Sequence, residues 1–371
     1  MAKNEYLEAA TAFVNYHKDD LNEKGNVELT ATPVFGGLIN NSWRIDSAHK
    51  APFLLQRINH EVFHNPQQVQ QNFINIWQYA EFEFTGLKLP TPLFYDQSQT
   101  LYEDGSGDFW RAFEFIEEST SKLVAQNSAQ AKATAKTFAK FIAAFEDFNL
   151  DNLKVVIPDF HNLSYRYQQF EDSLKTEISE RINAASEIVH ELKKREQYKH
   201  FYDLITESPE NFPLRVMHHD AKIANVLFSV KTGKVICAVD FDTVMPGYYF
   251  SDLGDIIRSM ACTEDENCTD FSKLEIRGDF YNAIVDGYLE VMQMQFTESE
   301  KKYIHYSGIL MVYMQALRFI SDYLNGDTYY QIQYPNQNFD RAFNQLTLLK
   351  KLESFLQEHC QFNSYQTVPV K

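Results

Sequence analysis

Three polar residues in the segment 214–258 have the types and the spacing that phosphoryl transfer requires. Asp220 is followed five residues later by Asn225, and an apolar run at 235–239 leads into Asp240. Kinases use this order to place one base and two metal ligands around ATP. The transferred phosphoryl group carries several negative charges, so Mg²⁺ must bind its oxygens while a carboxylate accepts the proton of the attacking hydroxyl. We therefore assign Asp220 as the base and Asn225 and Asp240 as the metal ligands.

The segments around these residues strengthen a pattern that would be weak alone, because His, Asp and Asn are common in turns. Residues 226–228 and 235–239 flank a Lys-Thr-Gly-Lys turn and predict a β-hairpin. The hairpin would place Asn225 and Asp240 near opposite ends of adjacent strands. Asp242 stands where protein kinases have the glycine of Asp-Phe-Gly. It is either a further metal or substrate contact or the partner of a nearby arginine.

The composition predicts a folded, acidic protein. A chain of 371 residues exceeds one ordinary core, which favours two or more packed lobes. The formal net charge of −17 argues against nucleic acid and acidic membranes as partners, because both would be repelled. We find no metal-binding cysteine pair, no run of membrane-spanning length and no apolar export signal. These features predict a soluble cytoplasmic protein that meets an anionic nucleotide through Mg²⁺ and a few basic side chains.

The N-terminal segments contain a candidate phosphate-binding turn. Residues 4–23 have apolar side chains near helical spacing and predict an opening helix. Residues 29–46 then form two short extended runs around Gly36 and Gly37. A glycine pair lets backbone N–H groups approach phosphate oxygens without a Cβ clash, so both glycines are candidate nucleotide contacts. An ordinary β-turn would carry two glycines as well.

A strand predicted at 53–58 supplies the candidate basic side chain for the α and β phosphates. We favour Arg57, with Gln56 as the alternative, because alternate side chains of a strand face opposite sides. Asn65 and Pro66 then begin a helix that runs to residue 84. Kinases place a glutamate partner for the cation on this helix, yet no glutamate lies in its middle.

Three more strands are predicted at 93–95, 100–102 and 109–116, with turn signals between them. Together with the earlier hairpin they make a five-stranded antiparallel sheet. The run 113–117 would be the hinge whose backbone meets adenine, which makes Phe115 and Glu117 candidate nucleotide contacts. An ordinary final strand explains this run nearly as well.

The chain turns helical beyond residue 128, with helices predicted at 129–147, 164–205, 271–294 and 301–324. Asp252 either caps the helix after the catalytic segment or holds the backbone of that segment. Asp252 and His218 are therefore assigned supporting roles. On the last of these helices Arg318 and Asp322 share one face, an arrangement that is usually a surface ion pair.

The order of glycine hairpin, small sheet, helical lobe and Asp/Asn motif resembles the aminoglycoside phosphotransferase and choline kinase superfamily. More narrowly, it is similar to the N-acetylhexosamine 1-kinases in four stretches: FGGLINNSW at 35–43, LQRINHEVFHNP at 55–66, HHDAKIANV through DFDTVMPG at 218–247, and residues 316–342. This resemblance implies an α+β, bilobal protein-kinase-like fold with a nucleotide-binding lobe at 1–117 and a catalytic, substrate-binding lobe at 118–371. It also implies MgATP-dependent phosphorylation of the anomeric hydroxyl of GlcNAc or GalNAc. Arg318 and Tyr329 become expected sugar contacts, with Asp322 as a further candidate.

Two other functions fit the same residues. One is a kinase of the same superfamily for another small alcohol, such as choline, an amino alcohol or an aminoglycoside, and the acidic charge favours a cationic substrate. The other is a nucleotide-binding pseudokinase. The intact set of Asp220, Asn225 and Asp240 argues against the second, because a protein that only binds nucleotide needs no base.

Overall fold

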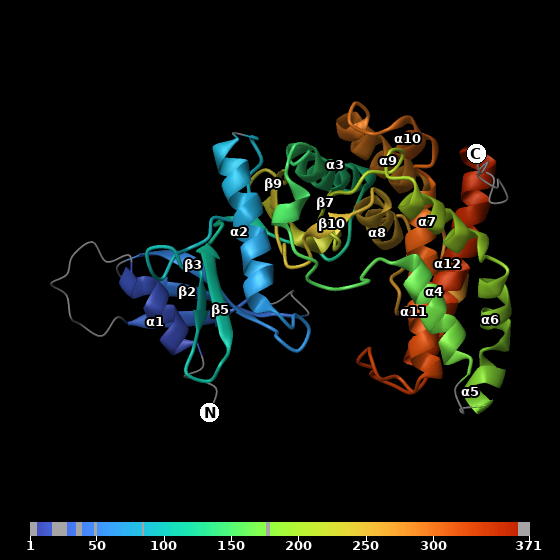
Figure 1. Cartoon of the computed structure of the whole chain (residues 1–371), viewed down its shortest axis with the longest axis horizontal. Coiled ribbons are helices and arrows are strands. Elements are labelled where there is room, and N and C mark those ends of the chain that lie inside the picture. Colours follow the sequence, from blue (N-terminus) through green and yellow to red (C-terminus); the bar gives the residue numbers. More distant parts are fainter. Residues whose placement is uncertain are drawn as a thin grey trace. The chain divides into compact units, whose positions relative to one another are not determined.

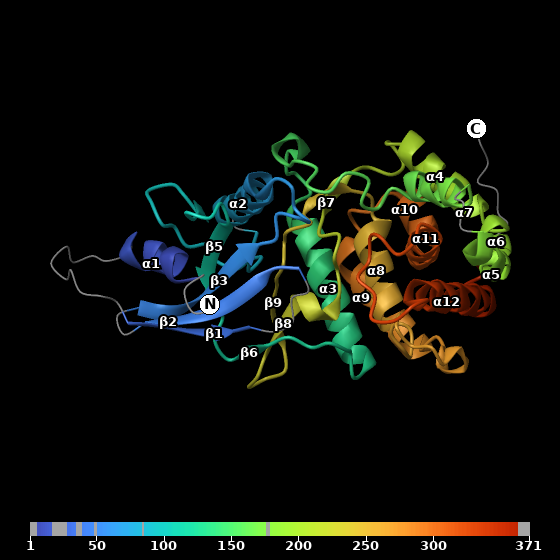
Figure 2. The same ribbon diagram turned by 90° about the horizontal axis from the view of Figure 1, so that it is seen from below.

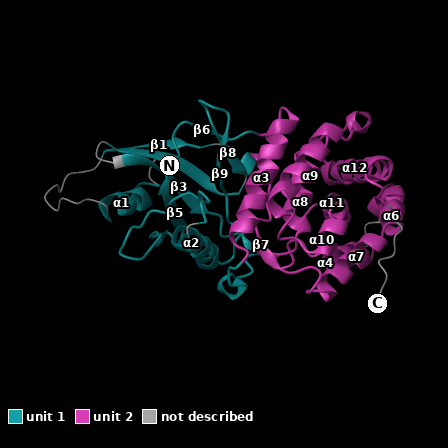
Figure 3. Cartoon of the chain, turned by 90° about the horizontal axis from the view of Figure 1, so that it is seen from above, with its two compact units in different colours: residues 1–122, 147–157, 224–245 teal, residues 123–146, 158–223, 246–371 magenta. Residues whose placement is uncertain are grey.

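The computed structural model describes residues 6–16, 28–34, 39–47, 50–83, 85–175 and 179–362. The chain forms two compact units (Figure 3). The first unit comprises Met1–Lys122, Asp147–Ile157 and Ala224–Met245, and the second comprises Leu123–Glu146, Pro158–Ile223 and Pro246–Lys371. The division into lobes at residue 117 stays a prediction. Within the described ranges, no helix is both long and apolar enough to cross a bilayer.

The first unit is built on a five-stranded antiparallel sheet, which confirms the predicted sheet. Its strands are, in spatial order, β1 (Leu29–Pro33), β2 (Asn41–Ser47), β3 (Lys50–Ile58), β5 (Phe109–Glu114) and β4 (Leu101–Glu103). The prediction of a strand at 93–95 is wrong, because the segment forms no regular ladder. The preceding Pro92 makes an isolated bridge with Phe113, and the backbone N–H of Leu93 donates to the carbonyl of Ala112. Pro90 and Pro92 have no backbone N–H, so they cannot extend a ladder of hydrogen bonds.

Side chains alternate between the two faces of this sheet. One face carries the buried residues Ile45, Phe53, Leu55, Trp110 and Ala112, which form a core cluster with helix α1 (Leu7–Tyr16). The opposite face carries Leu54, Gln56, Arg111 and Phe113, which line a cavity. The alternation therefore separates a hydrophobic face from a face that can bind a ligand.

Helix α2 (Pro66–Phe82) begins as predicted, with the Asn65 side chain accepting a hydrogen bond from the backbone N–H of Gln68 and proline in the first turn. Its buried Asn72 side chain donates to the carbonyl oxygens of Lys154 and Val244, both at 2.8 Å. These bonds attach the segments 147–157 and 224–245 to the first unit, although the two segments are distant in sequence.

The predicted hairpin is present in the first unit. Strands β8 (Val226–Ser229) and β9 (Val235–Ala238) pair antiparallel, and β6 (Ser119–Thr120) extends them to three strands in the order β6-β8-β9. A 3-10 turn, η2 (Ile223–Asn225), precedes β8, and another, η1 (Leu150–Asn152), lies in the segment held by α2. The hairpin fixes the backbone on either side of Asn225 and Asp240.

The second unit is mainly helical. Its helices are α3 (Ser128–Ala144), α4 (Leu163–Ser173), α5 (Ser179–Ala184), α6 (Ser186–Lys193), α7 (Gln197–Glu207), α8 (Phe250–Met260), α9 (Gly278–Met292), α10 (Glu298–Lys302), α11 (Tyr306–Leu324) and α12 (Gln337–His359), with a 3-10 turn η3 (Phe271–Lys273) and short strands β7 (Arg215–Met217) and β10 (Met245–Gly247). Helices α11 and α12 run side by side in two perpendicular views (Figures 1 and 2). Every residue of α11 except Arg318 is buried, so this helix is the centre of the unit.

Three predicted helices are broken in the structure. The stretch 271–294 forms the 3-10 turn η3 and the helix α9, which begins only at Gly278. The stretch 164–205 forms four shorter helices, α4 to α7, and the stretch 301–324 is divided between α10 and α11. The break before α11 follows Lys302, where a one-turn helix with a complete capping box at Thr297 ends. Helical spacing of apolar side chains gives the type of element but does not fix its ends.

Candidate functional site

A cavity of about 350 Å³ lies in the first unit. Its walls come from β2, β3 and β5, from the segment after β5 and from the β8–β9 hairpin. Polar groups that line it include Ser42, Gln56, Arg111, Asn225 and Asp240, and its apolar walls include Leu54, Phe113 and Leu227. A cavity with apolar walls and a few polar groups has the composition of a small-ligand site.

The cavity brings the two predicted metal ligands together. Asn225 precedes β8 and Asp240 follows β9, and the backbone N–H of Val239 donates to the carbonyl of Asn225 at 2.9 Å. As the sequence predicts, they lie at opposite ends of adjacent strands, and antiparallel pairing brings the start of β8 beside the end of β9. Asp240 has a left-handed backbone, with φ of 65°, which turns the chain sharply after β9.

The pair Asn225 and Asp240 suits Mg²⁺ bound together with phosphates. In the described residues, no group of three His, Cys, Asp or Glu side chains forms a metal site of its own. Mg²⁺ bound to a nucleotide does not need one, because one or two protein oxygens, the phosphates and water complete its octahedron. The Asp240 carboxylate and the Asn225 amide oxygen, at the open end of the β8–β9 hairpin, therefore fit this metal.

The structure distinguishes the two candidate side chains on β3. Gln56 lines the cavity and Arg57 does not. Arg57 lies on the opposite face, where its guanidinium pairs with Asp108 at 3.3 Å and stacks over Trp110. The alternation of side chains along the strand produces this difference, and the sequence could not show which of the two faces the cavity.

The remaining predicted nucleotide contacts fall into three groups. Phe115 lines the cavity, in the segment expected to be the hinge. Glu117 does not line it and instead accepts a hydrogen bond from Arg44 at 3.0 Å. Gly36 and Gly37 lie outside the described residues.

The sequence left two roles open for Asp242, a metal or substrate contact or the partner of an arginine. The structure pairs it with an arginine. Its partner is Arg111 of β5, and the two side chains are 3% and 2% exposed. Sequence reasoning did not single out Arg111. The sequence does contain a signal for it. Arg111 stands in the middle of the apolar run Phe-Trp-Arg-Ala-Phe, and a strand with so many apolar residues is more often buried than exposed to solvent.

In the second unit, Asp252 holds the backbone of the segment that precedes Asp220. Its carboxylate accepts hydrogen bonds from the backbone N–H groups of His218 at 2.9 Å and His219 at 2.7 Å. Burial raises the pKa of Asp252 to about 7, and the two N–H donors act in the opposite direction. Of the two roles open for Asp252, the structure shows the one that anchors the loop. His219 has a left-handed backbone, with φ of 65°, and this anchor stabilises it.

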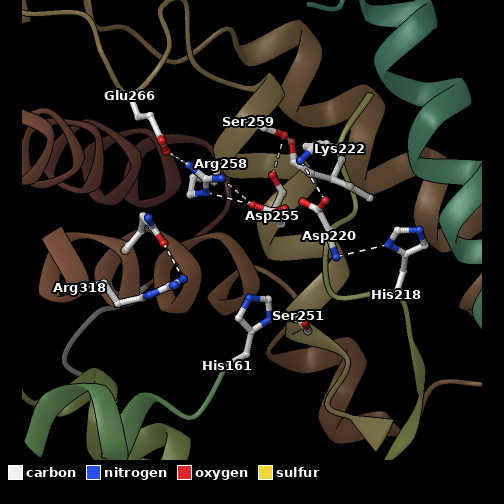
Figure 4. A network of polar contacts seen from close by, with 12 residues as sticks. His161, His218, Asp220, Lys222, Ser251, Asp255, Arg258, Ser259, Glu266 and Arg318 are labelled. Atoms are coloured by element: carbon white, nitrogen blue, oxygen red, sulfur yellow. Dashed lines mark hydrogen bonds and ion pairs between the residues drawn. The ribbon is translucent and has the colours of Figure 1, made fainter. Parts of the chain in front are cut away.

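Asp220 extends from this anchored loop (Figure 4). The ammonium group of Lys222 lies 2.9 Å from one carboxylate oxygen, and the backbone N–H of Asp220 donates to the His218 ring at 3.3 Å. His218 is fully buried and packs edge-on against Phe138 of α3, with ring centroids 5.0 Å apart. The ring of His218 therefore belongs to the support of the loop, and the carboxylate of Asp220 stays partly accessible.

A partly buried chain of side chains joins His219 to the segment before α4. The Ser251 hydroxyl lies 2.7 Å from Nδ1 of His219 and 2.6 Å from Nδ1 of His161. His161 stacks on Phe160, and the guanidinium of Arg318 lies over the same Phe160 ring. Burial lowers the pKa of His161 well below its usual value, and the charges of His219 and Arg318 act in the same direction. His161 is therefore neutral in the folded protein near neutral pH.

We expect this histidine to make the protein less stable in mild acid. The unfolded chain binds the His161 proton near pH 6.5, whereas the folded protein binds it only at lower pH, so the free energy of unfolding falls as the pH drops below 6.5. Urea unfolding at pH 7.5 and 5.5 should show a smaller loss for His161→Gln than for the wild type. Equal losses in the two proteins would contradict this assignment.

A second cavity, of about 390 Å³, lies wholly within the second unit. Its lining includes Arg166 and Gln169 of α4, Arg318 and Asp322 of α11, and Tyr329 and Tyr330. The guanidinium of Arg318 lies 5.9 Å from the Tyr329 ring centroid and 5.5 Å from that of Tyr330. All three predicted substrate contacts, Arg318, Tyr329 and Asp322, thus line one cavity. Arg166 is a cavity residue that the sequence did not indicate.

Asp322 and Arg318 do not form the ion pair that their spacing allows. The Asp322 carboxylate accepts hydrogen bonds from the backbone N–H groups of Thr328, Tyr329 and Tyr330 at 2.8–2.9 Å, and one from the Asn338 amide. It therefore fixes the loop that carries the tyrosines. Arg318 donates instead to Gln315 at 3.2 Å, and burial together with the charge of Arg318 lowers the pKa of Arg166.

A five-stranded antiparallel sheet with a ligand cavity, a hairpin that carries Asn225 and Asp240, and a helical unit define the protein-kinase-like fold of small-molecule kinases. The model of the phosphotransferase enzyme family (APH) matches residues 30–293. The chain belongs to this family.

Solved structures of this kind share the fold along most of the chain. An amicoumacin kinase in complex with AMP-PNP, Ca²⁺ and Ami is 11% identical, with a TM-score of 0.56, and the match covers 95% of this chain and 94% of that one. A spectinomycin phosphotransferase in complex with ADP and spectinomycin is 14% identical, with a TM-score of 0.52 and coverage of 89% and 93%. An ethanolamine kinase from Plasmodium vivax is 15% identical, with a TM-score of 0.53 and coverage of 92% and 89%.

Proposed function

We propose that the chain transfers the γ-phosphoryl group of ATP to the anomeric hydroxyl of an N-acetylhexosamine, GlcNAc or GalNAc, and releases the 1-phosphate. The observation that carries the choice of acceptor is the pair of arginines, Arg166 and Arg318, in the cavity of the second unit. The similarity to N-acetylhexosamine 1-kinases in four stretches of sequence supports the same acceptor.

The nucleotide would bind in the cavity of the first unit. Its apolar walls suit adenine, and Asn225 and Asp240 in its lining would hold Mg²⁺ on the phosphates. Bound there, Mg²⁺ neutralises charge that develops on the transferred phosphoryl group. Complexes of related folds with AMP-PNP and with ADP support the choice of an adenine nucleotide.

Asp220 would accept the proton of the attacking hydroxyl. Asn225 lies five positions after Asp220, so the covalent chain limits the distance between their Cα atoms to at most about 18 Å. This short connection supports a joint role for the base and the metal-binding pair. The Asp252 anchor limits the motion of the loop, which holds Asp220 in one orientation.

The arginine pair favours an uncharged acceptor that is rich in oxygen atoms. Guanidinium groups offer several N–H donors in a fixed plane, and these match ring hydroxyls and an amide carbonyl. The Tyr329 and Tyr330 rings offer an apolar surface for a sugar ring. A cationic acceptor would be repelled by two neighbouring positive charges, so the net charge of −17 is a poor guide to this site.

The second candidate is a kinase for another small alcohol. Ethanolamine kinase and aminoglycoside-type phosphotransferases have the same fold, and Asp172 places a carboxylate at the rim of the cavity. That carboxylate pairs with Lys175 at 2.7 Å, and the Asp322 carboxylate is occupied by four hydrogen bonds within the protein. The two arginines are therefore the charged groups that we expect to meet an acceptor.

An acceptor panel with phosphorus NMR of the products tests the proposed function. We expect MgATP-dependent conversion of GlcNAc or GalNAc to the 1-phosphate, with no turnover of choline, ethanolamine or an aminoglycoside. A 6-phosphate product would contradict the assigned hydroxyl. Turnover of choline or ethanolamine without turnover of any hexosamine would favour the second candidate.

We expect Arg318→Ala to raise the KM for the sugar by about tenfold to a hundredfold, the range of one or two lost hydrogen bonds to a charged donor. The KM for ATP should stay within about twofold, because a ground-state contact to one substrate affects mainly that substrate. Steady-state kinetics with each substrate varied in turn measures both constants. Lys351→Ala is the control, since Lys351 is a basic residue of the same unit that pairs with Glu275 at 2.6 Å and does not line the cavity. Equal changes in both KM values would contradict the assignment of Arg318.

A further inference from the structure

The cavity of the first unit must balance the charge of a triphosphate with very few basic groups. Among the described residues that line it, Arg111 is the sole arginine or lysine, while Glu114 and Asp240 add carboxylates. Residues 35–38, which lie outside the described ranges, are Phe-Gly-Gly-Leu and add no basic side chain. In a chain of net charge −17, a cation at this position has a large effect on anion binding.

Arg111 occupies the position of a ligand-binding side chain rather than a surface one. It lies on β5, directly opposite Gln56 of β3 in the antiparallel register, on the face that lines the cavity. Its side chain is only 2% exposed. A guanidinium buried to this degree costs free energy unless charged or polar partners surround it.

Two partners hold Arg111 in a fixed plane. Nε donates to Oε1 of Gln56 at 3.2 Å, and Nη2 donates to Oδ1 of Asp242. No described residue accepts a hydrogen bond from Nη1. Nε and Nη2 thus orient the guanidinium, and Nη1 remains as a donor for a ligand.

Each partner of Arg111 is itself held. The other carboxylate oxygen of Asp242 accepts a hydrogen bond from the side-chain amide of Asn40 at 2.6 Å. The side-chain oxygen of Asn40 in turn accepts one from the backbone N–H of Asn59 at 3.0 Å. The Gln56 amide donates to the Ser42 hydroxyl at 3.0 Å. Supporting bonds of this kind are typical of side chains that must be oriented before a ligand arrives.

We propose that Arg111 is the side chain that binds the nucleotide phosphates and that Asp242 is its positioning residue. This inference rests on the proposed use of ATP. Protein kinases use a lysine on β3 and a glutamate on the following helix for this task. Here β3 presents Gln56, and the buried polar side chains of α2 are Gln70 and Asn72. The cation is thus supplied by the neighbouring strand, and its carboxylate comes from the turn after β9.

The position of Asp242 links two functions of that turn. It lies two residues beyond Asp240, the proposed metal ligand. The same short segment would therefore hold the metal through one carboxylate and orient the phosphate-binding arginine through the other. An arginine suits this arrangement better than a lysine, because its fork can bind a carboxylate and a phosphate at the same time.

A purely structural role is the competing explanation, in which the pair only joins β5 to the turn after β9. The two roles differ in how the affinity for a ligand should depend on its number of phosphate groups. We would measure Kd by isothermal titration for adenosine, AMP, ADP and ATP with Mg²⁺. The proteins are the wild type, Asp242→Asn and the double variant Arg111→Gln/Asp242→Asn. The double variant removes both charges, because Arg111→Gln alone would leave a buried carboxylate unpaired and could unfold the protein.

We expect the Kd for ATP and ADP to rise about tenfold or more in the double variant, while the Kd for adenosine stays within about twofold. Asp242→Asn should give a smaller change of the same pattern. Equal changes for adenosine and ATP, or no change for either, would reduce the pair to a structural contact and overturn the inference.

Two further variants complete the test. Arg195→Gln removes a partly buried ion pair with Glu353 in the second unit. It should lower the melting temperature and leave the Kd values for adenosine, AMP, ADP and ATP unchanged relative to one another. Arg57→Gln tests the other strand position, and a phosphate-dependent loss there, with none in the double variant, would overturn the assignment to Arg111. If wild-type protein binds none of the four ligands, the proposed use of ATP fails. If it binds ATP normally and the Arg111 variants do as well, only the present inference fails.

Discussion

Replacing Asp220 with asparagine is expected to lower the turnover number by about two to four orders of magnitude, the usual contribution of a general base. Asparagine keeps the size of the side chain but cannot accept the proton of the acceptor hydroxyl. The Kd for MgATP should change little, because the proposed nucleotide contacts come from other residues. Single-turnover kinetics and isothermal titration give the two quantities separately.

Two controls accompany this variant. The melting temperature should stay within a few degrees of the wild type, since Asp220 is partly exposed and Asp252 holds the loop. Asp270→Asn removes an exposed carboxylate of the same unit, which pairs with Lys273, and should leave turnover unchanged. Near-normal turnover of Asp220→Asn would remove Asp220 from the role of base.

Asp240→Ala should abolish the dependence of nucleotide binding on Mg²⁺. The wild type is expected to bind ATP far more tightly with Mg²⁺ than with EDTA, whereas the variant should give nearly the same weak Kd in both conditions. Without the metal, the phosphates face a protein of net charge −17, so turnover should fall below detection.

The matched control for this variant is Asp151→Ala, which removes an exposed carboxylate of the first unit. It should show the same Mg²⁺ dependence as the wild type. Unchanged affinity for MgATP together with unchanged turnover in Asp240→Ala would leave Asp240 as a residue that only turns the chain after β9.

The residues that could be located from sequence are those whose signal is local. The hairpin around the Lys-Thr-Gly-Lys turn and the start of α2 at Asn65 and Pro66 depend on neighbouring residues alone. Both elements are present in the structure. The five-stranded sheet could be predicted for the same reason, although the proline-flanked segment 93–95 was included in error.

Residues whose placement depends on distant partners could not be located in this way. Arg57 and Gln56 are adjacent in sequence, and only the packing of α1 on one face of the sheet decides which of them reaches the cavity. Arg111 resembles a surface arginine until Asp242, far along the chain, is brought beside it. Helical spacing at 164–205 likewise gives no sign of the breaks between α4 and α7, because tertiary packing sets them.

The assignment of residues to the two units has a consequence for protein synthesis. The segments 147–157 and 224–245 belong to the first unit, so its chain is interrupted twice by parts of the second. A ribosome that has released residues 1–122 has therefore not yet supplied the β8–β9 hairpin or the partners of Asn72. The first unit therefore cannot complete its fold, and the cavity face of its sheet stays uncovered, until residue 245 has left the ribosome. A truncated chain that ends at residue 122 should consequently expose this face and aggregate.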